Sequence, residues 1–330
     1  MNLFNRLLLS VMLLFGLASA VPAQDSETRQ VVEVGVTLYL IDIDEINSVA
    51  QSFKGTLFAE LQWTDPELAH PGPDSISKDL SEIWYPRTQI LNRQQLVDTF
   101  PKSAEVRPNG EVIFKQRVWG DFSQPLELRH FPFDQQRLQL TLVNVKYGSR
   151  EVRYRINADS GISDSLRIPD WRVLAWDIAP HELAIGHGRT KIQGVVFTVE
   201  VERYASYFLL KVILPLILIV AMSWMVFWID PSLAASQISV AVTAMLTLIA
   251  YRFAIGGMVP RLGFLTSLDY FVMGSTILVF VVLLEVVYTA RLFQSGYQEK
   301  ARAVDRKARW IIPLIYFLMV IETLYLRIGI

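Results

Sequence analysis

The sequence predicts an N-terminal all-β immunoglobulin-like sandwich followed by a four-helix α transmembrane bundle. One observation is a set of four strongly apolar stretches, each long enough to cross a hydrocarbon core of about 30 Å, which takes roughly 20 helical residues. The other is that the chain before them has no comparable run after its first residues and reads as short strands. We therefore divide the chain into an outer domain, 24–204, and a membrane domain, 205–330. The four stretches are residues 206–228, 236–255, 267–291 and 310–328.

The outer domain has the sequence pattern of an antiparallel sandwich. Its candidate strands are rich in β-branched and aromatic residues, and several alternate apolar with polar, as in Leu138-Gln139-Leu140-Thr141-Leu142. Turn signals such as Pro108-Asn109-Gly110 separate them. Many short strands at this spacing are typical of two packed sheets. The candidate strands are residues 31–41, 55–63, 111–119, 137–145, 151–156, 172–177 and 195–201.

The first residues read as a signal peptide, 1–23. Arg6 precedes an apolar run over 7–17, and Ala18-Ser19-Ala20 or Val21-Pro22-Ala23 offers small residues for cleavage. The alternative is a signal anchor that stays as a fifth helix, but the apolar run is short and polar sequence follows at once. Export would place the outer domain outside the cytoplasm.

The loop between the last two stretches predicts the orientation of the membrane domain. Six basic residues and only two acidic ones lie in residues 291–309, which fits the excess of positive charge found on the cytoplasmic side. The connection around Asp230-Pro231-Ser232 would lie on the same side and is too short to hold a domain. The basic residues are Arg291, Lys300, Arg302, Arg306, Lys307 and Arg309.

Composition excludes several classes of function. Lysine and arginine number 31 against 32 acidic residues, and no basic run long enough to bind nucleic acid appears. Without a cysteine the chain has no disulfide, no thiolate metal site and no catalytic cysteine. The four histidines lack metal-ligand spacing, and no nucleophile motif or phosphate-binding glycine loop is present. We expect no enzyme activity, no metal and no cofactor.

The second apolar stretch differs from the others because hydroxyl groups recur along one helical face. Residues three or four apart fall on one stripe of a helix, and a stripe with hydroxyls can line water. The alternative is a helix–helix contact, because small residues also let membrane helices pack closely. The stripe consists of Ser236, Ser239, Thr243, Leu246, Ala250 and Phe253.

Several motifs together resemble a known family. Phe131-Pro132-Phe133-Asp134 is similar to the hallmark loop of the pentameric ligand-gated ion channels, the Cys-loop receptor superfamily. Here the flanking cysteines are missing, as in its prokaryotic members, which also lack a large cytoplasmic insert. Further marks follow in the order that the family has, from about Val31 to the C-terminus. They are Gln62-Trp63-Thr64, Trp84-Tyr85-Pro86 with Asn92, Arg203 before Tyr207-Phe208, Pro215 and Pro260.

The resemblance implies a homopentamer in which the second stretch of each subunit lines a pore. The pore-lining residues would then be Ser239, Thr243, Leu246, Ala250 and Phe253. Narrow apolar rings hinder conduction by dewetting, so we expect Leu246 and Phe253 to form the gate.

Ion selectivity is expected to depend on Asp230, Ser236 and Ser239 at the cytoplasmic mouth, and we expect monovalent cations to permeate. The alternative role for Asp230 is to cap the following helix, with Pro231 in its first turn. An anion-conducting channel of the same family is the alternative for selectivity.

The resemblance also implies a coupling region and a ligand site. Coupling residues at the junction of the two domains would be Asp134, Phe131, Pro132, Arg203 and Pro260, with Asp134 and Arg203 as charge partners. Ligand would bind between subunits near Phe58, Arg93 and Tyr147, where Arg93 disfavours an amine and favours a carboxylate. For Phe58 and Tyr147 the alternative is ordinary packing in the sandwich.

Protons are the rival stimulus to a small-molecule agonist. The candidates for pH sensing are His130, His181 and His187, together with the intramembrane acids Glu285 and Glu322. For both acids the alternative is structural pairing with an arginine such as Arg291, Arg327 or Arg252.

The expected partners are further copies of the chain, membrane lipids, permeant ions and an agonist or protons. We expect a bacterial inner membrane, with the outer domain in the periplasm or exterior. A non-conducting, membrane-anchored ligand-binding receptor is the alternative from another class, but it needs a cytoplasmic output module that residues 291–309 are too few to supply. A membrane-anchored enzyme would leave the polar face of the second stretch unexplained.

Overall fold

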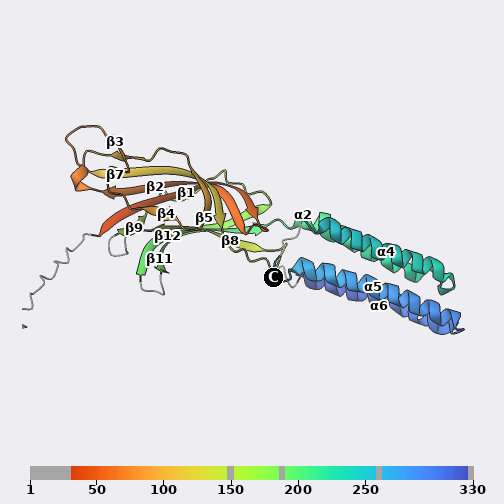
Figure 1. Cartoon of the computed structure of the whole chain (residues 1–330). Helices are drawn as coiled ribbons and strands as arrows, with labels where there is room; N and C mark the ends of the chain where they lie inside the picture. Colours follow the sequence, from red (N-terminus) through yellow and green to blue (C-terminus); the bar gives the residue numbers. More distant parts are fainter. Residues whose placement is uncertain (1–30, 147–151, 186–189, 258–261, 326–330) are drawn as a thin grey trace, which may run out of the picture.

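The computed structural model describes residues 31–146, 152–185, 190–257 and 262–325. The strands gather at one end of the molecule, and the long helices α4, α5 and α6 run away from them side by side (Figure 1). The predicted fold class, a β-sandwich followed by membrane helices, is confirmed. The predicted signal peptide lies outside the described residues.

The larger sheet is built on three long antiparallel strands, β1 (Val32–Asn47), β2 (Ser52–Thr64) and β7 (Glu111–Ser123). Its strand order is β10-β1-β2-β7-β6-β3, with β5 also paired to β7 and β9 also paired to β1. The shorter strands are β3 (Ile76–Asp79), β5 (Arg93–Asp98), β6 (Ser103–Val106), β9 (Val152–Ile156) and β10 (Gly161–Ile162).

The smaller sheet has the order β11-β12-β8-β4 and packs against the larger one. Its strands are β4 (Thr88–Ile90), β8 (Gln135–Asn144), β11 (Trp171–Ile185) and β12 (Thr190–Arg203). On β12 every second residue is buried, from Val195 through Phe197 and Val199 to Val201. This alternation is the period of a strand with one face on the core. The two sheets share one apolar core.

All seven predicted strand segments overlap strands of the structure, namely β1, β2, β7, β8, β9, β11 and β12. Strands β3 to β6 and β10 were missed. They have two to six residues each, and the exposed positions of β5 outnumber its buried ones, so neither length nor alternation marks them in the sequence. Strands β4, β5, β6 and β10 each pair with a long strand, and β3 pairs with β6.

The first membrane segment is continuous from residue 206 to residue 228. It consists of α2 (Ser206–Phe208), the π-helix η2 (Leu209–Ile213), α3 (Leu214–Trp224) and the 3-10 turn η3 (Met225–Trp228). Pro215, at the start of α3, has no backbone N–H and so donates no helical hydrogen bond. The Tyr251 hydroxyl of α4 donates to Val212 O at 2.6 Å and lies 3.4 Å from Lys211 O, so it ties α4 to the turn before this proline.

The remaining helices are α4 (Ala234–Ile255), which follows the short turn η4 (Pro231–Leu233), α5 (Ser267–Gln294) and α6 (Gln298–Tyr325). In the described part of the chain, three helical segments are long and apolar enough to cross a membrane: Ser206–Trp228, Pro231–Ile255 and Ser267–Gln294. The predicted fourth span, 310–328, begins within α6 and runs past the described residues, so it stays a prediction.

The helices pack in two layers. Helix α4 packs against α3 and α5, whereas α6 packs against α5, α3 and η3. The buried residues of α4 lie on one stripe and leave the opposite stripe uncovered in the single chain. The buried stripe consists of Gln237, Ala241, Ala244, Leu248 and Ile255.

The start of α5 is held by a capping box whose loss should be measurable. Thr266 is fully buried; its Oγ1 accepts from Asp269 N at 3.2 Å, and Asp269 Oδ2 accepts from Thr266 N at 2.8 Å. Thr266→Ala is expected to lower the free energy of unfolding by about 1 kcal/mol, checked by thermal unfolding. Thr276→Ala, inside the same helix, is the control, because the Thr276 hydroxyl donates to Val272 O within α5 and does not cap the helix. Equal melting of the two variants would contradict the role of the cap.

Candidate functional site

The stripe predicted to line a pore is the exposed stripe of α4. Leu246 is 61% exposed and Phe253 is 83% exposed in the single chain, and Ser239, Thr243 and Ala250 are exposed as well. The stripe lies opposite the face that packs on α3 and α5. Its hydroxyls lie toward the end of α4 that is remote from the sandwich, because the helix runs back toward the sandwich (Figure 1). That these residues line a pore stays a prediction.

Asp230 lies before α4 and has the geometry of a cap. Its carboxylate accepts from Ser232 N at 2.9 Å and lies 3.5 Å from Arg302 of α6. The hydrogen bonds from Ser232 and the charge of Arg302 hold the pKa of Asp230 below its usual range. The capping role, which the sequence left open beside a selectivity role, is therefore present. Ser236 is exposed in the first turn of α4. A selectivity role for either residue stays a prediction.

Asp134 and Arg203 form the predicted ion pair at the junction of the two domains. Arg203 Nε lies 2.7 Å from Asp134 Oδ1 and its Nη2 lies 3.1 Å from Oδ2, so the pair is bidentate. The Arg203 side chain is 7% exposed and that of Asp134 is 1% exposed. The guanidinium also lies over the Trp171 ring, 4.1 Å from its centroid, and donates to Ser48 Oγ at 2.9 Å.

Strand register explains why these two residues meet. Strands β8 and β12 are antiparallel, with Gln135 opposite Glu202. The next pair along the ladder is therefore Asp134 and Arg203, and Arg203 N donates to Asp134 O at 3.2 Å. Arg203, the last residue of β12, thus meets Asp134, which directly precedes β8, beside the first membrane segment. Their role in coupling stays a prediction.

The loop that contains Phe131 and Pro132 docks onto the membrane helices. Phe131 is buried, and its ring packs edge to face against the Phe208 ring, with 4.8 Å between the ring centroids. The carbonyls of Arg129 and Phe131 accept from the backbone N–H groups of Ser267 and Leu268 at 3.0 and 3.2 Å. The Ser267 hydroxyl also donates to Arg129 O at 3.1 Å. The loop is therefore bonded directly to the first turn of α5, whereas Pro260 lies outside the described residues.

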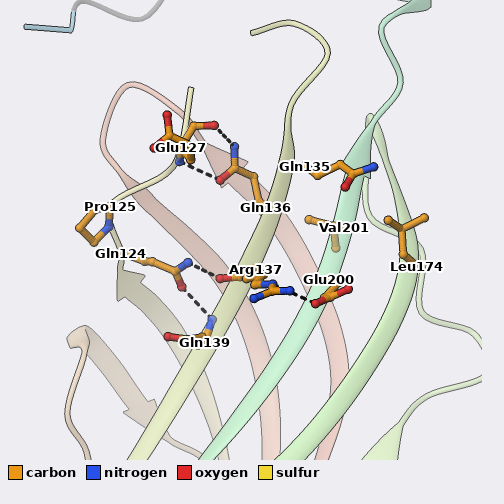
Figure 2. A pocket seen from close by; sticks show the side chains of 10 residues that line it. All are labelled: Gln124, Pro125, Glu127, Gln135, Gln136, Arg137, Gln139, Leu174, Glu200 and Val201. Atoms are coloured by element: carbon orange, nitrogen blue, oxygen red, sulfur yellow. Dashed lines mark hydrogen bonds and ion pairs between the residues drawn. The ribbon is translucent and has the colours of Figure 1, made fainter. Parts of the chain in front are cut away.

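Gln136 is a junction residue that the sequence analysis missed. Its Nε2 donates to Asp134 Oδ2 at 2.6 Å and to Glu127 O at 2.9 Å, and its Oε1 accepts from Glu127 N at 3.0 Å. Gln136 also lines a surface pocket of about 470 Å³ (Figure 2). Its neighbours in the pocket include Arg137 and Glu200, whose side chains pair at 2.9 Å. The sequence pattern could have indicated Gln136, because it is a polar residue two positions before Leu138 and so shares the face of the strand that packs on the core.

The predicted ligand residues are not brought together within one chain. Phe58, on β2, is half-buried. Its ring packs edge to face against the Phe100 ring, with 6.4 Å between the ring centroids. Arg93 begins β5, is exposed, and donates to Gln89 at 3.1 Å. It lines a second pocket of about 230 Å³, to which Phe58 does not contribute. Tyr147 lies outside the described residues. A site between subunits stays a prediction.

The candidates for pH sensing are dispersed. His130 and His181 are exposed, one in the junction loop and the other on β11, and Glu322 is exposed on α6. Glu285 is half-buried on α5, and its carboxylate oxygens have no hydrogen-bond partner among the described residues. His187 lies outside those residues. In the described part of the chain, no group of three or more histidine, cysteine, aspartate or glutamate residues could hold a metal ion.

Comparison with known proteins agrees with this arrangement. The family model described as neurotransmitter-gated ion-channel ligand binding domain matches residues 18–204, and the model described as neurotransmitter-gated ion-channel transmembrane region matches residues 212–300. Gamma-aminobutyric acid receptor subunit beta-4 of Gallus gallus is 24% identical over 273 residues, which cover 79% of this chain and 56% of the relative. This chain thus spans little more than half of the relative's length. The resemblance seen in the sequence is confirmed, and the chain belongs to the neurotransmitter-gated ion-channel family within the Cys-loop receptor superfamily.

Proposed function

We propose that the chain forms a homopentameric channel that conducts monovalent cations and opens when an agonist or protons act on the sandwich. The observation that carries the proposal is the uncovered stripe of α4. This stripe exposes the hydroxyl-bearing residues Ser239 and Thr243 together with Leu246 and Phe253, whereas a face in contact with lipid would favour apolar residues alone. Five copies around an axis would turn each stripe toward a shared aqueous pore.

The order of residues along the stripe supports a gate. Ser239 and Thr243 would form hydroxyl rings that replace part of an ion's hydration shell, while rings of Leu246 and Phe253 would be narrow and apolar. An apolar constriction stops ions by dewetting. The hydroxyl rings would then contact permeant ions, and the apolar rings would open and close.

Two linkages at the junction support transmission from the sandwich to this gate. One is the buried Asp134–Arg203 pair, which lies just before the first membrane segment. The other is the bonding of the Phe131 loop to the first turn of α5. Helix α5 packs against α4, so a movement of the sandwich that shifts α5 would also shift the pore-lining helix.

The basic segment between the last two helices and the exposed apolar side chains of α5 and α6 support one orientation of the chain in the membrane. The basic segment 291–309 is expected on the cytoplasmic side of a bacterial inner membrane, which leaves the sandwich in the periplasm or exterior. Large apolar side chains that α5 and α6 leave exposed, such as Ile277, Leu284, Leu314 and Leu318, would contact lipid.

Currents from the purified full-length protein in planar bilayers test the proposal. The outer pH is stepped from about 5 to 9, the range in which histidine titrates, under a sodium chloride gradient and with small amines and carboxylates as trial agonists. A gated current that reverses near the sodium potential is expected. Reversal near the chloride potential would identify an anion channel. Silence in protein shown to be pentameric would favour the non-conducting receptor.

Asp230 allows a direct test of selectivity. Asp230→Asn leaves Arg302 unpaired, so five uncompensated guanidinium groups would surround the cytoplasmic mouth. We expect the cation-to-anion permeability ratio to fall several-fold, read as a shift of the reversal potential toward that of chloride. Glu299→Gln, at an exposed position on α6 three residues before Arg302, is the control. An unchanged reversal potential would restrict Asp230 to its capping role.

A further inference from the structure

A groove of about 350 Å³ lies between the end of α5 and the beginning of α6, at the end of these helices that is remote from the sandwich (Figure 1). Tyrosines, lysines and aliphatic side chains line it, and none of its lining residues is acidic. We call it the α5–α6 groove. Its lining includes Tyr288 and Leu292 of α5, Tyr297 of the connection, and Lys300, Val304 and Lys307 of α6.

The positive charges of the groove are not neutralised within the described part of the chain. Neither the Lys300 nor the Lys307 ammonium group has a carboxylate partner among those residues, and Lys300 lies over the Tyr297 ring, 5.0 Å from its centroid. Arg302 of the same helix differs, because its Nε lies 3.5 Å from the Asp230 carboxylate. The two lysines are two helical turns apart, about 10 Å along the axis, so their long side chains can converge on one anion between them.

The groove lies where the hydrocarbon core of a membrane would end. Helix α5 has 28 residues and is about 42 Å long, which exceeds the roughly 30 Å of a hydrocarbon core. Its last turns, which contain Tyr288 and Leu292, therefore reach the headgroup layer. Tyrosine is enriched at this depth, because its ring is apolar and its hydroxyl group is polar. On α6 the two lysines precede the apolar stretch 310–328.

Exposed apolar side chains continue the groove toward the middle of the membrane. On each helix they follow the lining residues at spacings of three or four, so they share one helical face with them. A ligand whose polar end binds the lysines thus meets an apolar surface suited to an acyl chain, which a soluble anion would leave unused. The stripes consist of Tyr288, Leu284, Val281 and Ile277 on α5 and of Lys307, Ile311, Leu314 and Leu318 on α6, all exposed.

We propose that the α5–α6 groove binds the headgroup of an anionic phospholipid. Its phosphate contacts the ammonium groups of Lys300 and Lys307, and an acyl chain follows the apolar stripes. Basic pockets between membrane helices at a membrane surface bind such headgroups, and a lysine ammonium group is a strong donor to phosphate. A zwitterionic lipid has no net negative charge, so it neutralises the two lysines less well.

The lipid site goes beyond the proposed function, which enters only by placing this end of the helices at the cytoplasmic leaflet. In a pentamer arranged around α4 the groove would face lipid, because α6 packs against α3, α5 and η3 in the outer layer of helices. A bound headgroup would contact both α5 and α6 and so hold the two helices together. Lipid binding is therefore expected to raise the stability of the bundle.

Thermal unfolding of the purified full-length protein in detergent tests the site without requiring conduction. Short-chain phosphatidylglycerol is titrated, with short-chain phosphatidylcholine as the zwitterionic comparison. The anionic lipid should raise the melting temperature of the wild type by roughly 4 °C more than the zwitterionic one, because a ligand that binds only the folded state stabilises it. In the double variant Lys300→Gln with Lys307→Gln, the concentration that gives half of this rise should increase about tenfold or more.

The chain supplies a control that removes the same amount of charge. Arg291 and Arg306 are exposed in the same basic segment, and neither lines the groove. The double variant Arg291→Gln with Arg306→Gln should therefore respond to the anionic lipid as the wild type does. Equal weakening in both double variants would show general attraction to the basic segment and would overturn the proposal. Equal stabilisation of the wild type by the two lipids, or by neither, would also overturn it.

Soluble anions separate a lipid headgroup from a free phosphate. Inorganic phosphate and glycerophosphoglycerol, which is the headgroup without acyl chains, should leave the melting temperature unchanged at the same concentrations. If either matches phosphatidylglycerol, the groove takes a soluble anion and the proposal is wrong. If the lysine double variant does not fold, Lys300→Gln and Lys307→Gln are measured singly, and each should weaken the response. A silent channel that responds to phosphatidylglycerol as expected would count against the proposed function alone.

Discussion

Replacing Leu246 by serine is expected to produce a channel that conducts at rest or opens with a far weaker stimulus. Five hydroxyls would wet the narrow apolar ring and so lower the barrier that dewetting imposes on ions. We expect the stimulus for half-maximal current to fall about tenfold, which corresponds to about 1.4 kcal/mol over the pentamer. Dose–response curves and resting currents in planar bilayers measure the effect.

The chain provides a closely matched control for this substitution. Leu218 on α3 is 61% exposed, the same value as Leu246, but it does not lie on the stripe of α4. Leu218→Ser should therefore leave resting current and activation near those of the wild type. If the two variants behave alike, Leu246 does not form the gate, and the uncovered stripe has another function.

Breaking the Asp134–Arg203 pair is expected to destabilise the fold strongly. Arg203→Ala leaves the Asp134 carboxylate buried with its guanidinium partner removed, a change that typically costs about 3–5 kcal/mol. Arg203→Lys should recover only part of this, because an ammonium cannot bond both carboxylate oxygens and Ser48 in the same planar arrangement. Denaturant unfolding and the yield of pentamer on size exclusion are the measurements.

Two comparisons separate the buried charge from the contact itself. The double variant Asp134→Asn with Arg203→Gln removes both charges and should be more stable than Arg203→Ala alone. Arg155 and Glu33 form an exposed pair at 3.2 Å, and Arg155→Ala should cost at most about 1 kcal/mol. Equal losses from Arg155→Ala and Arg203→Ala would show that burial contributes nothing to the junction pair. Normal stability of Arg203→Lys with impaired activation would assign the bidentate geometry to gating.

The long strands and apolar helices could be predicted because their evidence is local. The alternation in β8 and β12 and the length of the apolar stretches are properties of consecutive residues. The short strands β3 to β6 could not be predicted from the sequence, because they are stabilised by pairing with strands elsewhere in the chain. The meeting of Asp134 with Arg203 was within reach of the sequence, since each ends or begins a recognisable strand.

Other parts of the site depend on contacts that no local pattern encodes. The bonding of Ser267 to the carbonyl of Arg129 joins residues 138 positions apart. Gln136 could be seen as polar on an inward face, but its bonds to Asp134 and Glu127 depend on how the preceding loop folds back. Gln237, Glu285 and Asp305 have buried oxygen atoms without a hydrogen-bond partner among the described residues, and they lie on three different helices, so no local pattern groups them.

The sequence by itself determined the kinds of element and their order, because strand and helix periodicity, hydropathy and turn residues act over a few positions. It also determined the stripe of α4, since residue spacing decides which side chains share a helical face. Only the tertiary structure decided that the opposite face is the one that packs on α3 and α5, leaving the stripe uncovered. It likewise decided that Asp134, Arg203 and Asp305 are buried, because the dielectric environment of a charge depends on everything that folds around it.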